Sequence, residues 1–254
     1  MKTYAFDFTG KTALVTGASR GIGAAIAQAL AAHNATVILA SRKIEGLCEI
    51  EQAIASSGGA AYSIPCHTGD LSQIENLFQT IQERWGGIDL LVNNAATNPY
   101  FGEMLGVDEG VWDKTMSVNL KGYFFIAQKA ARMMKERKGG AIVNVASVNG
   151  IRPAPGQGIY SISKAAVISM TRAFAKELAP YGIRVNALLP GLTDTKFSSV
   201  MTSNEAILNA ILPTIPMHRI AKPEEMVGAV LYLLSDMASY TTGSLIVADG
   251  GMIA

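Results

Sequence analysis

Short apolar runs alternate with longer segments of helical periodicity along the whole chain. The apolar runs have the length of strands and lie at residues 12–16, 36–40, 61–64, 88–92, 141–145, 183–189 and 244–248. The clearest helical patterns between them lie at residues 20–32, 43–57, 71–85, 108–137, 161–180 and 223–235. Strands that are apolar on both faces and alternate with helices are typical of a parallel sheet covered by helices on both sides. We therefore expect an α/β fold with one doubly wound sheet of about seven strands.

No break in composition divides the chain. It contains no Pro/Ser-rich tract, charge run or internal repeat that would mark a linker, so we expect residues 1–254 to form a single domain. Residues 192–222 lack clear periodicity and combine Pro213 and Pro216 with scattered apolar residues such as Met201 and Ile207. A long, partly apolar excursion from a compact domain is more often a binding loop than a defect, and this segment predicts a substrate lid.

Composition narrows the class of protein. Hydrophobic residues make up 49% of the chain, which is enough for a large core, and the formal net charge is only +1. Because nucleic-acid-binding domains normally carry a basic excess, we expect no nucleic-acid partner. No apolar run approaches the length of a membrane-spanning helix, and residues 1–7 include no apolar core of a signal peptide.

The two cysteines indicate a compartment. Cys48 and Cys66 have neither the number nor the spacing of a disulfide scaffold or a zinc site. This usage fits a reducing environment. We therefore expect a cytoplasmic enzyme that has no metal site and no membrane segment.

The first predicted strand ends in a glycine-rich turn, TGASRGIG at residues 16–23. Glycines where a strand turns into a helix let backbone amides and the helix N-terminus approach a pyrophosphate. No Lys-Ser or Lys-Thr follows the glycines, which disfavours a phosphate-transferring P-loop. The turn predicts a dinucleotide-binding Rossmann fold. The expected cofactor contacts are Gly17, Ser19, Arg20, Gly21, Ile22 and Gly23.

The end of the second predicted strand indicates which cofactor binds. An NAD site usually has an acidic residue here to bind the ribose 2′-hydroxyl, but this chain has Ser41, Arg42 and Lys43. Arg42 can bind a 2′-phosphate through charge-assisted hydrogen bonds, Ser41 can add a hydroxyl donor, and Arg20 can lie on the other side of that phosphate. We therefore expect NADP(H). The alternative is that Arg42 and Lys43 are solvated charges at the start of a helix.

Tyr160 and Lys164 lie four residues apart in the stretch at the start of a predicted helix. Residues i and i+4 share a helix face, so the phenol and the ammonium group can point to one place. Ser147 follows a predicted strand 13 residues before Tyr160, and Asn119 lies 41 residues before it. Taken singly, Ser147 also fits a strand-end turn, Tyr160 a half-buried aromatic residue and Asn119 a helix kink. Together they predict a catalytic constellation.

With these motifs in this order, the chain resembles the short-chain dehydrogenase/reductase family over essentially its whole length. Two further segments carry the resemblance: NNAA at residues 93–96, after the fourth predicted strand, and Pro-Gly at residues 190–191. The resemblance implies additional cofactor contacts from Asn94, Ala95, Tyr160, Lys164, Pro190, Gly191, Thr193 and Thr195. It also implies a homotetramer.

The resemblance implies a role for each member of the constellation. Tyr160 would give the substrate oxygen its proton as a general acid, and Ser147 would donate a hydrogen bond to the same oxygen. Lys164 would bind the ribose of the nicotinamide and would lower the pKa of Tyr160, because a nearby positive charge favours a phenolate. Asn119 would hold a water molecule that links Lys164 to solvent.

Two positions depart from the family pattern. His67 stands where many members carry an aspartate that binds adenine. We include His67 among the cofactor contacts, with a plain loop histidine as the alternative. Ala96 replaces the commoner glycine and keeps a small residue near the cofactor.

The substrate is expected at the carboxyl ends of the later strands. Candidate segments are residues 98–101, Asn149 with residues 151–155, and residues 192–215 of the lid, which are mostly apolar or neutral. The contacts we select are Phe101, Ser147, Asn149, Pro153 and Tyr160. The expected activity is NADPH-dependent reduction of a ketone or aldehyde. Alternatives within enzymes are an NAD(P)-dependent alcohol or polyol dehydrogenase and a 3-oxoacyl-thioester reductase. A non-catalytic nucleotide-binding regulatory protein is the alternative from another class.

Overall fold

Seven parallel strands form one sheet at the centre of the protein. A computed structural model describes residues 5–202 and 204–254, without the side chains of residues 200 and 201, and the sheet order within them is β3-β2-β1-β4-β5-β6-β7. The strands are β1 (Thr12–Thr16), β2 (Thr36–Ser41), β3 (Ala60–Pro65), β4 (Leu90–Asn93), β5 (Gly140–Val145), β6 (Ile183–Pro190) and β7 (Leu245–Ala248). This confirms the predicted single-domain Rossmann-type fold. The order reverses between β1 and β4, which is where such sheets bind ligands.

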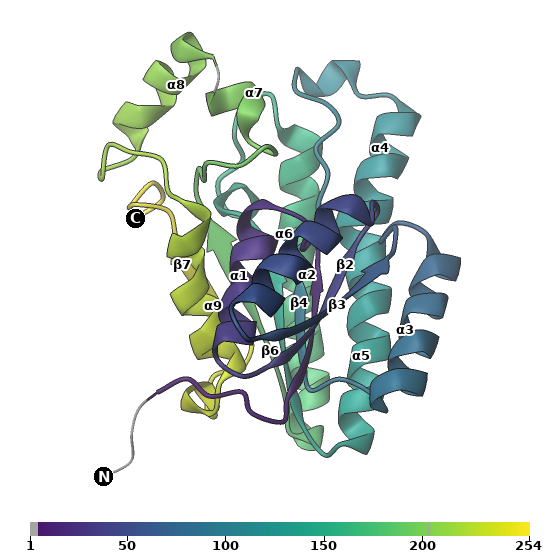
Figure 1. The fold of residues 1–254 in the computed structure, drawn as a ribbon. Coiled ribbons are helices and arrows are strands. Elements are labelled where there is room, and N and C mark those ends of the chain that lie inside the picture. The colour runs from purple at the N-terminus through teal and green to yellow at the C-terminus, as the bar shows by residue number, and fades with distance from the viewer. Residues whose placement is uncertain (1–4, 203) are drawn as a thin grey trace.

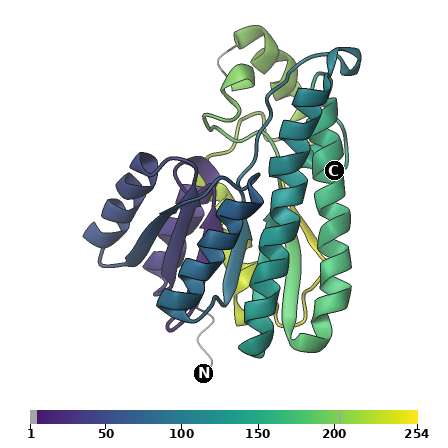
Figure 2. The same cartoon turned by 90° about the vertical axis from the view of Figure 1, so that its right-hand side faces the viewer.

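The main helices are α1 (Gly21–Ala32), α2 (Glu45–Ser56), α3 (Leu71–Trp85), α4 (Glu109–Met116), α5 (Tyr123–Glu136), α6 (Gly158–Leu178) and α9 (Val227–Leu234). Successive residues of a strand point to opposite faces of the sheet. Val15 and Leu39 therefore join the apolar core on the side of α1, α2 and α9, whereas Leu14 and Ile38 join the core with α3, α5 and α6. Figure 1 shows the resulting three layers, and Figure 2 shows α5 and α6 side by side.

The predicted helix 108–137 is interrupted. A π-helical segment, η2 (Ser117–Gly122), separates α4 from α5. Gly122 packs so tightly there that a Cβ would stand 2.0 Å from the Thr68 carbonyl oxygen. Such single-turn π segments occur frequently at functional sites. This one contains Asn119, between α4 and α5.

The proposed lid segment has more regular structure than its sequence pattern predicts. Helices α7 (Ser199–Thr202) and α8 (Glu205–Ile211) lie in it, at the top of Figure 1, while Ser203 lies outside the described residues. Asn204 caps α8 by accepting hydrogen bonds from the backbone N–H groups of Ala206 and Ile207. Helices of one or two turns are too short to show a clear 3.6-residue period, which explains why the sequence reading found none.

Short 3-10 turns complete the chain. They are η1 (Met104–Gly106), η3 (Val148–Gly150), η4 (Ala179–Tyr181), η5 (Leu212–Thr214), η6 (Pro223–Met226) and η7 (Asp236–Ala238). Among the described helices, none is both long and apolar enough to cross a membrane.

Candidate active site

One cavity of about 1100 Å³ opens at the carboxyl ends of the central strands. It is lined by the glycine turn, the ends of β2 to β6, the start of α6, the lid and residues 252–253. All but two of the residues predicted for the site line it; the exceptions are Gly23 and Asn119. Within the described part of the chain, no aspartate or glutamate lines the cavity, whereas seven basic residues do: Arg20, Arg42, Lys43, Lys114, Arg152, Lys164 and Lys196.

The glycine turn is packed too closely for side chains. At Gly17, whose φ is +66°, a Cβ would lie 2.8 Å from the Cα of Ala95. At Gly23, a Cβ would lie 2.3 Å from the carbonyl oxygen of Gly17. Gly23 therefore lets α1 pack against the turn and does not itself face the cavity. Ser19, Arg20, Gly21 and Ile22 line the cavity where α1 begins.

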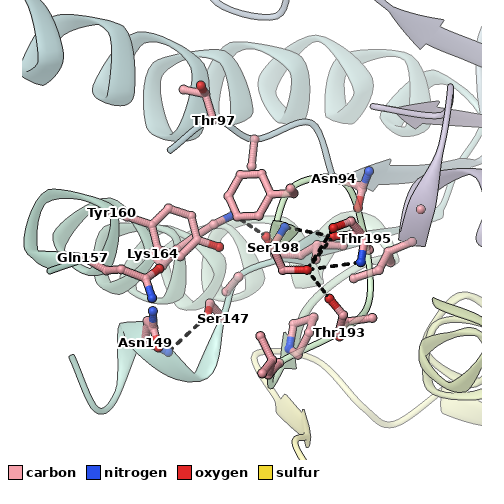
Figure 3. Close-up of a pocket in the computed structure, with 18 of the residues that line it drawn as sticks. Asn94, Thr97, Ser147, Asn149, Gln157, Tyr160, Lys164, Thr193, Thr195 and Ser198 are labelled. Atoms are coloured by element: carbon pink, nitrogen blue, oxygen red, sulfur yellow. Dashed lines mark hydrogen bonds between the residues drawn. The ribbon is translucent and has the colours of Figure 1, made fainter. Parts of the chain in front are cut away.

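Thr16 fixes the glycine turn to the end of β4, a function the sequence reading missed. Its buried hydroxyl accepts hydrogen bonds from the backbone N–H groups of Asn94 (2.9 Å) and Ala95 (3.1 Å). In return, Nδ2 of Asn94 donates to the carbonyl oxygens of Thr16 (3.0 Å) and Gly17 (3.2 Å). Asn94 thus faces the turn, and it is labelled among the cavity-lining residues in Figure 3. The sequence signal was a threonine directly before the first glycine.

Ser41, Arg42 and Lys43 come at and after the end of β2, which pairs with the end of β1 just before the turn that carries Arg20, and all four residues line the cavity. Both arginines are exposed to solvent. This arrangement is consistent with an anionic ligand at this end.

His67 lines the cavity and is held in one orientation. Its ring Nδ1 accepts a hydrogen bond from the backbone N–H of Gly69 (3.0 Å), and the backbone N–H of His67 donates to Oε1 of Gln73 (2.8 Å). The nearby carboxylate, Asp70, is used elsewhere: it caps α3 by accepting from the N–H groups of Ser72 and Gln73. The hydrogen bond from the Ser72 hydroxyl is the main reason the pKa of Asp70 falls to about 2.

Tyr160 and Ser147 meet on one wall of the cavity (Figure 3). Tyr160 lies in the first turn of α6 and is 7% exposed. Burial raises the pKa of its phenol to about 12, and a side-chain hydrogen bond with Ser147 partly opposes this rise. The direction is opposite to the lowering that the sequence argument expects. The physical reason is that desolvation disfavours the phenolate more than the neighbouring groups stabilise it.

Lys164 is buried directly behind Tyr160. Its Nζ lies 5.7 Å from the centre of the Tyr160 ring and donates to the Val145 carbonyl oxygen at 2.7 Å. A second, longer hydrogen bond of 3.4 Å reaches the hydroxyl of Tyr123. Burial lowers the pKa of Lys164 to about 7, so this ammonium group loses its proton far more easily than an ordinary lysine.

Asn119 is fully buried, and its side chain does not bond to Lys164. Its Oδ1 accepts from the N–H of Thr97 (2.8 Å), and its Nδ2 donates to the Thr97 carbonyl oxygen (2.9 Å) and to Oγ of Ser163 (3.1 Å). The side chain therefore joins the segment after β4 to α6. Ser163, which accepts one of these hydrogen bonds, directly precedes Lys164 in α6.

The segment after β6 crosses the glycine turn. Thr195 lies so close that a Cβ on Gly21 would be 3.1 Å from its methyl group. Ser198, which the sequence reading missed, organises this segment by donating to the Thr193 carbonyl oxygen (2.5 Å) and lying 3.2 Å from Oγ1 of Thr195 (Figure 3). Pro190, Gly191, Thr193 and Thr195 all line the cavity.

The other end of the cavity has a polar floor and apolar walls. Asn149 and the previously unassigned Gln157 are both buried and lie near Ser147 and Tyr160 (Figure 3). Gln157 accepts a hydrogen bond from Asn98 at 3.4 Å. The walls come from Phe101, Pro153, Phe197, Ile207, Ile211, Met252 and Ile253. Of the candidate residues 98–101, Phe101 alone lines the cavity.

The donor chemistry does not suggest a metal. In the described part of the chain, no three His, Cys, Asp or Glu residues lie close enough to hold one together.

The chain is similar to known proteins over nearly its whole length. The model of the enoyl-(acyl carrier protein) reductase family matches residues 17–253. The chain is 41% identical over 241 residues to dehydrogenase/reductase SDR family member 4 from Mus musculus, an alignment covering 95% of this chain and 86% of that protein.

Two solved structures are closely similar. A short-chain type dehydrogenase/reductase from Mycobacterium marinum has a TM-score of 0.93 and 38% identity, covering 98% of both chains. A gluconate 5-dehydrogenase from Burkholderia cenocepacia, solved in complex with NADP and tartrate, has a TM-score of 0.93 and 30% identity, covering 97% of this chain and 96% of that one. The protein belongs to the short-chain dehydrogenase/reductase family of oxidoreductases.

Proposed function

We propose that the protein is an NADP(H)-dependent oxidoreductase that reduces a ketone or an aldehyde to an alcohol. The observation that carries this proposal is the shared cavity. Ser147, Tyr160 and Lys164 meet on one wall of it, and Arg20 and Arg42 line the region expected to hold a phosphate. No acidic side chain from the described residues lines that cavity, which supports a phosphorylated cofactor.

The residues present fit a dinucleotide. Gly17, Ser19, Gly21 and Ile22 line the cavity where α1 begins, so the backbone of the turn can approach a pyrophosphate there. Arg42 stands at the end of β2 where a carboxylate would repel a 2′-phosphate. When bound, a nicotinamide cofactor supplies the hydride for carbonyl reduction.

Tyr160 is the proposed proton donor. Its buried phenol keeps its proton at neutral pH, because burial holds the pKa near 12. It can therefore give that proton to a carbonyl oxygen as negative charge develops there. Ser147 lies beside it and would donate a hydrogen bond to the same oxygen, fixing the substrate in the direction of attack.

Lys164 is proposed to support the proton transfer from the Tyr160 phenol. Its Nζ lies 5.7 Å from the Tyr160 ring, and in the charged form it would stabilise the phenolate left after proton transfer. A pKa near 7 also lets this group exchange protons readily at neutral pH. Asn119 is proposed to hold the surrounding segments in register, through Thr97 and Ser163, for a water-mediated path to solvent.

A second candidate function is oxidation or reduction of a sugar acid. It is favoured by Arg152 and Lys196, two cavity-lining cations with no acidic partner among the cavity-lining residues described. Buried Asn149 and Gln157 could bind hydroxyl groups. The similar gluconate 5-dehydrogenase makes this substrate class a direct comparison. A 3-oxoacyl thioester is the third class, because the matching family model is named for an enzyme that acts on acyl groups of the acyl carrier protein.

A screen of NADPH oxidation tests the proposal. The panel contains neutral ketones and aldehydes, β-keto esters, keto sugar acids and acyl thioesters. The proposed function predicts turnover of a neutral carbonyl compound. Faster turnover of the sugar acids would favour the second candidate. NADPH binding without turnover of any substrate would favour a regulatory nucleotide-binding protein.

Assembly and location remain part of the proposal. We infer a homotetramer from family membership. The surface of α4 to α6 supports an interface because Trp112, Phe124 and Ile162 are partly exposed there. Both cysteines are free thiols, which supports a reducing, cytoplasmic location. Sedimentation analysis tests the homotetramer. Fractionation of the native host tests the cytoplasmic location.

A further inference from the structure

Tyr123 is a buried titratable residue to which neither the motifs nor the proposed chemistry gives a role. It is the first residue of α5, directly after the π-helical segment, and only 1% of it is exposed. A buried tyrosine hydroxyl needs a hydrogen-bond partner, because an unsatisfied polar group in a protein interior is costly. The partner of the Tyr123 hydroxyl is the Val145 carbonyl oxygen, which also binds Lys164.

Three groups from three elements meet at this point. The Tyr123 hydroxyl of α5 donates to the Val145 carbonyl oxygen of β5 at 3.2 Å. Lys164 of α6 donates to the same carbonyl oxygen at 2.7 Å and to the Tyr123 hydroxyl at 3.4 Å. The arrangement closes a triangle of hydrogen bonds in which the Tyr123 oxygen faces the lysine nitrogen.

The ring of Tyr123 adds to this contact. Nζ of Lys164 lies 5.0 Å from the ring centre, within the range of a cation–π interaction. The hydroxyl and the ring therefore both favour a charged amine at this place.

Few other groups face the Lys164 amine. From α6, Tyr160 presents its ring at 5.7 Å, and Ser147 after β5 interacts with that phenol. From the π-helical segment, Asn119 directs its amide to Thr97 and Ser163. No carboxylate among the described residues lines the cavity.

We propose that Tyr123 is a positioning residue for Lys164. The Tyr123 hydroxyl holds the lysine amine against the Val145 carbonyl oxygen and stabilises the charged form of the amine. The inference rests on the proposed function only in that Lys164 is taken to stabilise the phenolate of Tyr160. Burial raises the pKa of Tyr123 well above its ordinary value, so the hydroxyl keeps its proton and donates it to Val145. One of its lone pairs then remains for Lys164. Burial brings the pKa of Lys164 to about 7, where a modest change in stabilisation alters its charge at neutral pH.

The test is a titration of Lys164 that does not depend on turnover. The full-length protein is labelled with ε-13C-lysine, and the Lys164 signal is assigned by its loss in Lys164→Met. Its midpoint is compared between wild type, Tyr123→Phe and a matched control, Tyr232→Phe. The Tyr232 hydroxyl lies 3.0 Å from Oγ1 of Thr241, and Tyr232 does not line the cavity.

Removing the hydroxyl deletes an acceptor of the ammonium form, so the midpoint should fall. We expect a shift of roughly half a pH unit downward in Tyr123→Phe and none in Tyr232→Phe. A wild-type midpoint in Tyr123→Phe would overturn the proposal. A shift in Tyr123→Leu but not in Tyr123→Phe would also overturn it, because the ring and not the hydroxyl would then stabilise the charge.

A kinetic measurement separates this inference from the proposed function. If a substrate is found, the alkaline limb of the kcat profile should move to lower pH in Tyr123→Phe, while KM for NADPH stays close to wild type. A uniform loss of kcat with no movement of the limb would indicate a structural role and contradict the proposal. If no substrate is turned over, the proposed function fails, but the lysine titration still decides the inference.

Discussion

The ring of Phe197, in the segment after β6, lies 5.6 Å from the ring of Tyr160 at an interplanar angle of 47°. Phe197 is 42% exposed and lines the cavity, so it forms a wall beside the proposed proton donor. A substrate carbonyl that reaches Tyr160 must place one substituent against this ring. Phe197 is therefore placed to influence which substituent fits.

Phe197→Ala should change substrate preference more than stability. With the wall removed, kcat/KM for a small ketone should fall roughly tenfold, while a bulky ketone should lose less or gain. A size series of ketones measures this. Tyr240→Ala is the matched control, because Tyr240 is fully exposed and does not line the cavity. Equal losses across the series would mean that Phe197 does not shape the substrate site.

Arg42→Ala should weaken the use of NADPH selectively. Loss of a charge-assisted contact to the 2′-phosphate is expected to lower kcat/KM for NADPH roughly 10- to 100-fold and to leave NADH nearly unchanged. Steady-state kinetics with both cofactors measure the effect. Arg172→Ala, which replaces another exposed arginine, should leave both values as they are. If Arg42→Ala affects NADPH and NADH equally, the phosphate contact is wrong.

Thr16→Val should loosen the glycine turn. Valine has nearly the same shape but cannot accept the hydrogen bonds from the N–H groups of Asn94 and Ala95. We expect a loss of about 1–3 kcal/mol in the free energy of unfolding and a raised Kd for NADPH. Urea unfolding and fluorescence titration measure the two effects. Thr16→Ser keeps the acceptor and should bind like wild type; an unchanged Kd in Thr16→Val would show that the clamp does not support binding.

Lys164→Met should make stability less dependent on pH. The pKa of Lys164 falls from an unfolded value of 10.5 to about 7 on burial, so between these values the unfolded chain binds more protons. This group therefore makes wild-type stability rise with pH from about 7 to 10.5 and lowers it at and below neutral pH. Urea unfolding at several pH values should show the gain of Lys164→Met over wild type shrinking as pH rises. A constant difference would contradict the lowered pKa.

The sequence predicts what depends on local pattern. The apolar runs indicate the parallel sheet, and the glycine turn is recognisable because its position between strand and helix is itself local. Tyr160 and Lys164 are linked by helical spacing alone. Their neighbourhood in the cavity follows from the topology, which brings the ends of β4, β5 and β6 together.

Other features depend on tertiary contacts that no local pattern carries. Tyr123 reaches Lys164 only because α5 and α6 pack side by side, and Gln157 gains its place from the turn before α6. The raised pKa of Tyr160 follows from its burial, which the motif does not encode. The π-helical turn at Asn119 keeps the helical spacing of apolar residues nearly intact, so the segment 108–137 read as one helix.

The most direct test of the account is NADPH oxidation by wild type and Tyr160→Phe on one ketone panel, with NADH in parallel. Wild type should turn over the ketones, with NADPH preferred over NADH. Tyr160→Phe should still bind NADPH and lose nearly all turnover, because it lacks the proton donor. Substantial reductase activity in Tyr160→Phe, or a wild-type enzyme clearly better with NADH, would contradict it.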